Sequence, residues 1–229
     1  MKNLLVLRNE TSLERSNEFF EKNSVDFFSF PISISKPLKL DLSNIDTDIF
    51  LVTSLNAYQA VKDNLDILKQ KKVYCLNKHI ADKLKDIGVV KLDWDNTKQL
   101  AQYIINNEKS GAKIVHLCAD NANKLFYDSL IENGFKITEV NAYETSFVEN
   151  FDENIINALK SEEIKYIMVF SLASIKAMLD ILKLNNLDYK NYKIICFSKK
   201  MAQGLSPYYA YNSKIEDMLE IYLNLEGKK

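Results

Sequence analysis

An internal repeat constrains the fold of this chain more than any other feature. Ile49–Val61 matches Tyr166–Met178, and Val73–Leu84 matches Ile194–Leu205, at offsets of 117 and 121 positions. Each segment joins a short apolar run to apolar residues at helical spacing, which is typical of a β-strand followed by an α-helix. A chain that carries the same two βα units twice is expected to form two similar α/β domains.

Each half of the repeat needs a third βα unit, and this unit lies at a different position in the sequence for each half. In the middle of the chain it follows directly, as Lys113–Gly134. After Leu205 there is only the short run Tyr208–Tyr211 and a terminal helix expected from about Lys214. A strand, polar loop and helix of the right size occur at the other end of the chain, in Asn3–Asn23. The first strand is therefore predicted to belong with the last third of the chain.

This pairing predicts a discontinuous first domain with a second domain inserted into it, both flavodoxin-like with parallel sheets. The expected ranges are 1–32 plus 148–229 for the first domain and 38–140 for the second. The two crossings, 29–38 and 138–148, alternate apolar and polar residues as extended chain does. We expect them to form a two-stranded β connector that permits relative domain motion, with a ligand bound between the domains.

Composition narrows the class of partner. Thirty basic residues balance thirty-one acidic ones, so no general positive field would attract nucleic acid or an anionic membrane. The first apolar run, Leu4–Leu7, is shorter than the roughly 7–15 residues of a secretory signal. Three cysteines in apolar runs, without a CxxC pair, favour buried thiols in a reducing compartment. We expect a cytoplasmic protein that is a monomer, since no sustained exposed apolar stripe is visible.

Standard catalytic motifs are absent from the sequence. It contains no GxGxxG, Walker lysine motif, GxSxG or HExxH. With only His79 and His116, a histidine-rich metal site and a Ser-His triad are not expected. His116 lies inside an apolar run and is interpreted as a core or strand-edge residue, whereas His79 lies in a predicted strand-end loop.

The predicted strand-end loops are where a ligand would bind, because helix N-termini in an open α/β sheet point their free N–H groups there. Ser54 and Ser171 occupy equivalent loops in the two halves and are interpreted first as helix N-caps, a role compatible with ligand contact. Basic residues recur in the loops that contain Lys78 and Lys199. This repetition favours an anionic ligand, although a lysine on a loop is more often simply solvated.

Tyr143 is the candidate for chemistry. It lies on the second crossing, where its side chain can point into the space between the domains. The alternative is an amphipathic tyrosine that packs its ring at a domain interface.

The ordered set of short motifs resembles the uroporphyrinogen-III synthase family. The residues that carry the resemblance are VLR at Val6–Arg8, VTSLNAY at Val52–Tyr58, LIENGFKITEVNAYET at Leu130–Thr145 and VFSLASI at Val169–Ile175. They span essentially the whole chain. The family's GxxTA loops read differently here, as Asn77–Ala81 and Ser198–Ala202, and both glycines and both threonines are replaced.

The resemblance implies a cofactor-free, metal-free lyase that acts on hydroxymethylbilane, a linear tetrapyrrole with eight carboxylates. The reaction loses the terminal hydroxyl as water, inverts the last pyrrole through a spiro intermediate and closes the ring. Tyr143 matches the family's tyrosine and would be the acid at the leaving group. The implied substrate-binding residues are Arg8, Thr53, Ser54, Asn77, Lys78, His79, Lys124, Ser171, Ser198, Lys199 and Lys200.

Two other functional classes remain open at this point. One is a non-catalytic two-domain protein that binds a small molecule or sugar, against which the absence of a signal peptide counts. The other is a degenerate homologue that keeps the fold as a binding or interaction module, as the altered GxxTA loops allow.

Overall fold

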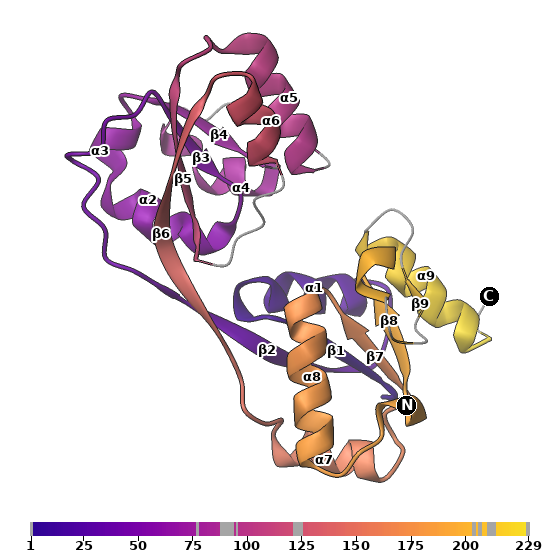
Figure 1. Cartoon of the computed structure of the whole chain (residues 1–229). Coiled ribbons are helices and arrows are strands. Elements are labelled where there is room, and N and C mark those ends of the chain that lie inside the picture. The colour runs from indigo at the N-terminus through magenta and orange to yellow at the C-terminus, as the bar shows by residue number, and fades with distance from the viewer. Residues whose placement is uncertain are drawn as a thin grey trace. The chain divides into compact units, whose positions relative to one another are not determined.

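The computed structural model describes residues 2–76, 78–87, 94, 96–120, 126–202, 205, 208–209 and 214–227. The chain divides into two compact units, and in each unit β-strands that are far apart in the sequence pair with one another (Figure 1). Unit 1 consists of Met1–Ile34 and Ser146–Lys229, and unit 2 of Ser35–Thr145. The ranges predicted for the two domains fall inside these units.

Unit 1 is built on parallel strands in the order β2-β1-β7-β8-β9. The strands are β1 (Leu4–Asn9), β2 (Phe27–Pro37), β7 (Tyr166–Val169), β8 (Lys193–Cys196) and β9 (Tyr208–Tyr209). The runs LLVL in β1 and YIMV in β7 are wholly buried, as expected for strands covered on both faces. Since β1 pairs with β7, the prediction that the first strand belongs with the last third is confirmed.

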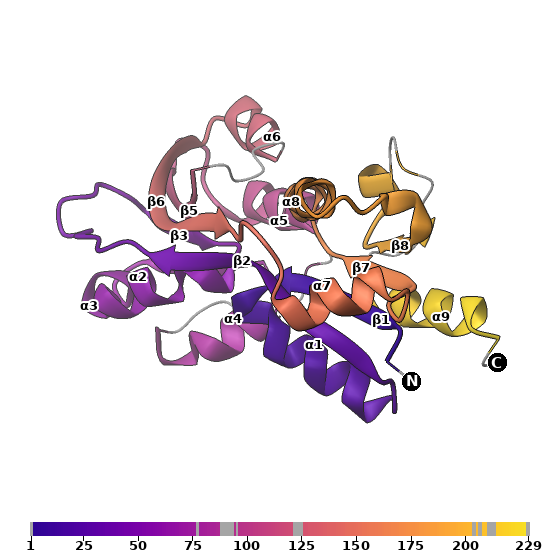
Figure 2. The ribbon, with the colours of Figure 1, turned by 90° about the horizontal axis from the view of Figure 1, so that it is seen from below.

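Helices cover both faces of the unit 1 strands (Figures 1 and 2). On one face, α7 (Glu153–Lys160) and α8 (Leu172–Leu184) pack against Leu5, Leu7 and their neighbours. On the other face, Phe20 of α1 (Glu10–Lys22) and Tyr222 of α9 (Ile215–Leu225) share a core with Leu4 and Val6. The short 3₁₀ turns η3 (Tyr189–Asn191) and η4 (Lys199–Ala202) flank β8.

Unit 2 repeats this plan with the parallel order β4-β3-β5-β6. Its strands are β3 (Ile49–Val52), β4 (Lys72–Cys75), β5 (Lys113–Ala119) and β6 (Lys136–Phe147). One face is covered by η1 (Leu55–Ala57), α2 (Tyr58–Asp63), α3 (Leu65–Leu68), α4 (Lys78–Lys83) and η2 (Lys85–Ile87). The other face is covered by α5 (Thr97–Asn107) and α6 (Tyr127–Glu132).

The two strand orders correspond element by element, β4-β3-β5-β6 to β8-β7-β1-β2. This correspondence accounts for the internal repeat and confirms the predicted α/β class. The predicted crossings lie almost entirely in β2 and β6, which are neighbours in the strand order. Leu38 N donates to Ala142 O at 3.0 Å, and Val148 N donates to Ile32 O at 3.2 Å. Residue numbers therefore rise along one segment as they fall along the other, so the two segments are antiparallel.

Two local predictions are wrong. A polar loop was expected between the strand and the helix of Asn3–Asn23, but Arg8 is a strand residue and α1 begins at Glu10, directly after β1. The reason is the Asn9 side chain, which accepts a hydrogen bond from Thr11 N at 3.1 Å and so caps the helix immediately after the strand. The described residues 199–202 form the turn η4 where an α-helix was expected after β8, whereas the counterpart in unit 2 is the helix α4.

A third difference lies in the helix expected after Ser54, which is interrupted between α2 and α3. Asn64 stands at the break with φ −125° and ψ 28°. Its buried side chain donates to Leu40 O at 3.1 Å and to Ala60 O at 2.9 Å, and accepts from Leu42 N at 3.0 Å. These bonds tie the incoming chain to the helix, at the expense of the continuous helix that α8 forms in unit 1.

Candidate functional site

The carboxyl end of β3 in unit 2 presents two hydroxyl side chains in succession, Thr53 and Ser54. Adjacent residues of extended chain point to opposite faces, so the two hydroxyls have different surroundings. The Thr53 Oγ1 atom lies 2.8 Å from His116 Nε2. The Ser54 Oγ atom accepts a hydrogen bond from Asn56 N at 3.2 Å and caps η1, as the sequence predicts.

His116 connects the Thr53 hydroxyl to the interior of unit 2. Its ring is 1% exposed, and its Nδ1 atom lies 2.5 Å from the Tyr127 hydroxyl. The rings of Phe126 and Tyr127 each pack edge-on against it, with centroids 5.7 Å away. Burial lowers the pKa of His116 to about 4, against the opposing effect of the Glu139 charge, so the imidazole is neutral at physiological pH. Of the two interpretations given to His116, a core or a strand-edge residue, the core position is confirmed.

Tyr143 packs within unit 2, in the same core cluster as Val52 and Ala57, and is 8% exposed. Burial raises the pKa of its phenol, and hydrogen bonds with the Ser54 and Asn56 side chains and the Ala119 backbone oppose that rise. The hydroxyl is therefore protonated at neutral pH and lies at the carboxyl edge of β3 and β5. Its place opposite Ala119 in the β5–β6 register turns the side chain into unit 2.

In unit 1, the equivalent edge presents the half-buried side chain of Arg8. The Arg8 guanidinium lies over the Phe170 ring, with its Cζ atom 3.9 Å from the ring centroid. Its Nε and Nη1 atoms are buried and have no hydrogen-bond partner within the described part of the chain. Burial, and secondarily the charge of Arg15, lowers the pKa of Arg8 to about 10, so the side chain is still charged at neutral pH.

Phe170 follows β7 at the repeat position that Thr53 occupies after β3. It lies beside Arg8 because Leu7 pairs with Val169 in the β1–β7 register. The two units thus offer different groups at the same topological place, a guanidinium supported by an aromatic ring and a hydroxyl supported by an imidazole. Arg8 and Thr53 were predicted from the sequence as binding residues. Phe170 and Tyr127 were not, although Phe170 lies within the VFSLASI motif, because their contacts depend on segments distant in the sequence.

The remaining predicted binding residues that the structure describes follow the carboxyl ends of β4, β7 and β8. Ser171 is the N-cap of α8, and its Oγ accepts from Ser174 N at 3.1 Å. Ser198 is half-buried, and its carbonyl accepts from Met201 N at 3.1 Å. Four side chains are exposed, namely Lys78, His79, Lys199 and Lys200. Asn77 and Lys124 lie outside the described residues.

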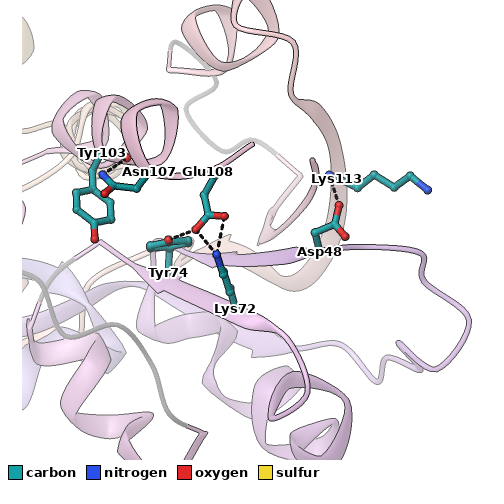
Figure 3. Close-up of polar contacts among 7 residues, drawn as sticks. All are labelled: Asp48, Lys72, Tyr74, Tyr103, Asn107, Glu108 and Lys113. Atoms are coloured by element: carbon teal, nitrogen blue, oxygen red, sulfur yellow. Dashed lines mark hydrogen bonds and ion pairs between the residues drawn. The ribbon is translucent and has the colours of Figure 1, made fainter. Parts of the chain in front are cut away.

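The amino-terminal edge of the unit 2 sheet has polar groups that satisfy one another (Figure 3). Lys72 Nζ donates to both carboxylate oxygens of Glu108 at 2.8 Å, and the Tyr74 hydroxyl donates to Glu108 Oε1 at 2.5 Å. Nearby, Lys113 N donates to Asp48 Oδ2 at 2.8 Å. Asp48, Lys72 and Glu108 line a hollow at this edge, which is opposite the edge that carries Thr53 and Tyr143. They stabilise the edge and leave little for a ligand to bind.

Groups that could bind a metal ion, and the free cysteines, were located in the described ranges. Within them, no group of three or more His, Cys, Asp or Glu side chains is arranged to hold a metal ion. Cys75, Cys118 and Cys196 are all buried free thiols, and burial raises the pKa of Cys75 to about 12 and that of Cys196 to about 11. None of the helices in the described chain combines the length and apolarity that a membrane span requires.

Comparison with known proteins identifies structures that share this fold. No curated protein sequence matches the chain. A uroporphyrinogen-III synthetase from Helicobacter pylori is 18% identical, with a TM-score of 0.68 over 98% of this chain and 100% of that one. A mutant uroporphyrinogen III synthase from Thermus thermophilus is 12% identical, with a TM-score of 0.60 over 99% of both chains. These likenesses establish the fold. The family model described as uroporphyrinogen-III synthase HemD matches residues 15–214, and the chain therefore belongs to the uroporphyrinogen-III synthase family.

Proposed function

We propose that this chain is a lyase that converts hydroxymethylbilane into uroporphyrinogen III in tetrapyrrole biosynthesis. Family membership over residues 15–214 supports the reaction, and the groups at the carboxyl edges of both units support a polyanionic substrate. From its composition, we expect the enzyme to act as a monomer in the cytoplasm.

The reaction needs one proton and accurate positioning. An acid protonates the terminal hydroxyl and the C–O bond breaks. Water is released, and the substrate becomes an azafulvenium cation. The cation is attacked by a substituted pyrrole carbon to give the spiro intermediate, which rearranges and closes the ring with the last pyrrole inverted. The proton lost when the final pyrrole regains aromaticity restores the acid, so only water is released overall. Because the substrate supplies the electrons, the protein mainly folds it and holds its carboxylates.

Tyr143 is the proposed acid. Its pKa is raised by burial, so the phenol holds its proton at neutral pH. The hydrogen bonds with Ser54, Asn56 and the Ala119 backbone would stabilise the transient phenolate, since they oppose the effect of burial. A group protonated at rest and stabilised when deprotonated has the properties that proton donation to a leaving hydroxyl requires.

The environment of Arg8 is the observation that best supports a substrate with carboxylate groups. A buried guanidinium with two nitrogen atoms lacking acceptors in the described chain is costly unless a ligand completes it. A carboxylate matches its planar donors and forms strong charge-assisted bonds. No neutral sugar would compensate the buried charge in this way.

The other groups would complete the carboxylate contacts. Thr53, Ser54, Ser171 and Ser198 supply hydroxyls, and the exposed Lys78, His79, Lys199 and Lys200 supply donors that can adjust to the substrate. Asn77 and Lys124 remain predicted contacts from the family resemblance.

Incubation with enzymatically generated hydroxymethylbilane tests the proposal. Formation of the type-III isomer, in place of the spontaneous type-I ring, would establish the enzyme. Binding without turnover would favour a degenerate homologue that retains a binding module. Absence of binding would overturn the tetrapyrrole assignment and leave a binder of a different small molecule.

A further inference from the structure

Three side chains of unit 2 form a continuous hydrogen-bonded row, and the proposed function uses only one of them, Thr53. It runs from Thr53 Oγ1 to His116 Nε2 over 2.8 Å, and from His116 Nδ1 to the Tyr127 hydroxyl over 2.5 Å. The three residues come from the end of β3, the middle of β5 and the start of α6. The row therefore links the buried interior to the carboxyl edge of the sheet.

The protonation state of the imidazole limits what the row can do. Burial lowers the pKa of His116 to about 4, so the ring is neutral. A neutral imidazole has one N–H donor and one bare nitrogen acceptor. Either Nε2 carries the hydrogen and donates to Thr53, or Nδ1 carries it and Thr53 donates to Nε2.

Tyr127 selects between these two tautomers. Among the residues that the structure describes, its hydroxyl has His116 Nδ1 and the Cys118 side chain as neighbouring partners. A thiol is a weak acceptor and an imidazole nitrogen is a strong one, so the phenol donates to Nδ1. The hydrogen of the ring is then on Nε2, where it is donated to Thr53 Oγ1.

This tautomer leaves the hydrogen of the Thr53 hydroxyl available to a ligand. Thr53 is half-buried, and within the described chain its hydroxyl has no other side-chain partner. In the opposite tautomer, Thr53 would use its only hydrogen on His116 and present lone pairs to the ligand. Lone pairs repel a carboxylate, so the tautomer decides whether Thr53 binds an anion.

The internal repeat shows that the fold does not require this polar pair. In the strand register, Leu117 pairs with Val52 as Leu7 pairs with Val169, which makes Val6 the unit 1 equivalent of His116. Val6 is 0% exposed, and Phe170 stands where Thr53 does. Unit 1 thus has an apolar pair at the same places, so the buried imidazole of unit 2 needs a reason other than packing.

We infer that His116, oriented by Tyr127, is a positioning residue that makes the Thr53 hydroxyl a dedicated hydrogen-bond donor to a carboxylate of the substrate. The identity of this carboxylate rests on the proposed function. His116 itself touches no substrate in this inference. It acts only through Thr53.

The first test reads the tautomer directly and does not depend on catalysis. The chain has only two histidines, so ¹⁵N correlation spectra of the imidazoles are simple to assign with a His79→Gln variant. We expect His116 to be neutral at pH 7 with its hydrogen on Nε2, and Tyr127→Phe to move hydrogen toward Nδ1. A wild-type ring with its hydrogen on Nδ1 would overturn the inference, whether or not the protein is a synthase.

The second test uses kinetics with hydroxymethylbilane. Thr53→Val removes one hydrogen bond to a charged group, and we expect KM to rise about tenfold with kcat unchanged. His116→Leu should raise KM by a similar factor, whereas His116→Gln should raise it less, because its amide can still donate to Thr53. The Thr53→Val/His116→Leu double variant should have a KM no higher than that of either single variant.

Multiplying effects in the double variant, or an unchanged KM with only a lower Tm, would show a structural role and overturn the inference. Tyr103→Phe is the matched control, because Tyr103 lies on α5, on the same face of unit 2 as Tyr127, and its substitution should leave KM unchanged. If the wild type binds hydroxymethylbilane without producing the type-III isomer, the proposed function fails separately, and Kd replaces KM in the same comparison. If it does not bind, the carboxylate assignment fails with the proposed function.

Discussion

Replacing Arg8 by methionine should stabilise the fold while weakening substrate binding. The guanidinium has two buried nitrogen atoms without acceptors among the described residues, and leaving a buried donor unsatisfied costs about 1–3 kcal/mol. The cation–π contact with Phe170 offsets about 0.5–2 kcal/mol of this. Methionine keeps an unbranched stem and a favourable sulfur contact with the ring. The expected gain in the free energy of unfolding is about 1 kcal/mol.

The effect on binding should have the opposite sign. A charge-assisted hydrogen bond contributes about 1.5–3 kcal/mol, so losing the guanidinium should raise KM by about 10- to 100-fold. The gain in stability should depend on pH in a defined way. Because the pKa of Arg8 is lowered to about 10 in the folded protein, the charge penalises folding throughout the neutral range. The wild type loses that penalty only above pH 10, so the difference between the two proteins should shrink there.

Urea unfolding at pH 7 and at pH above 10, combined with steady-state kinetics on hydroxymethylbilane, measures both effects. Lys22→Met is the control, since Lys22 is exposed in the last turn of α1 and its substitution should leave KM almost unchanged. A destabilised Arg8→Met protein with wild-type KM would refute the reasoning, because it would mean that the guanidinium is satisfied within the fold.

Substitutions at three further positions test separate parts of the account. Tyr143→Phe should lower the rate of type-III product formation at least about tenfold, or about 1.4 kcal/mol of barrier, and a wild-type rate would exclude it as the acid. Ser171→Ala should cost about 1 kcal/mol of stability through loss of the α8 N-cap, seen by thermal unfolding, whereas Ser171→Asp should keep the cap but raise KM by repelling carboxylates. Tyr74→Phe should destabilise unit 2 by about 1.5–3 kcal/mol through loss of its bond to Glu108, whose side chain is only 9% exposed, and denaturation that matches the wild type would contradict this.

The architecture could be predicted from the sequence because the repeat is itself a consequence of topology. Two copies of the same βα units impose the same strand order, and the search for a missing unit placed β1 beside β7. Local helix continuity was less predictable. The interruption at Asn64 depends on carbonyl and amide groups of Leu40 and Leu42, which no local pattern identifies.

The candidate site was predictable only as a set of places. Strand ends marked Arg8, Thr53 and Ser171, but their surroundings depend on register between strands distant in sequence. Phe170 meets Arg8 only through the β1–β7 pairing. Tyr127 meets His116 only because α6 covers that face of β5.

The isomer ratio of the product tests the central claim most directly. Hydroxymethylbilane closes spontaneously to the type-I ring, so the enzyme must compete with that reaction. Products formed at increasing enzyme concentrations would be oxidised and separated by chromatography. The account predicts that the type-III fraction rises with enzyme until it accounts for nearly all product. A ratio fixed at the spontaneous type-I outcome, at every enzyme concentration, would contradict it.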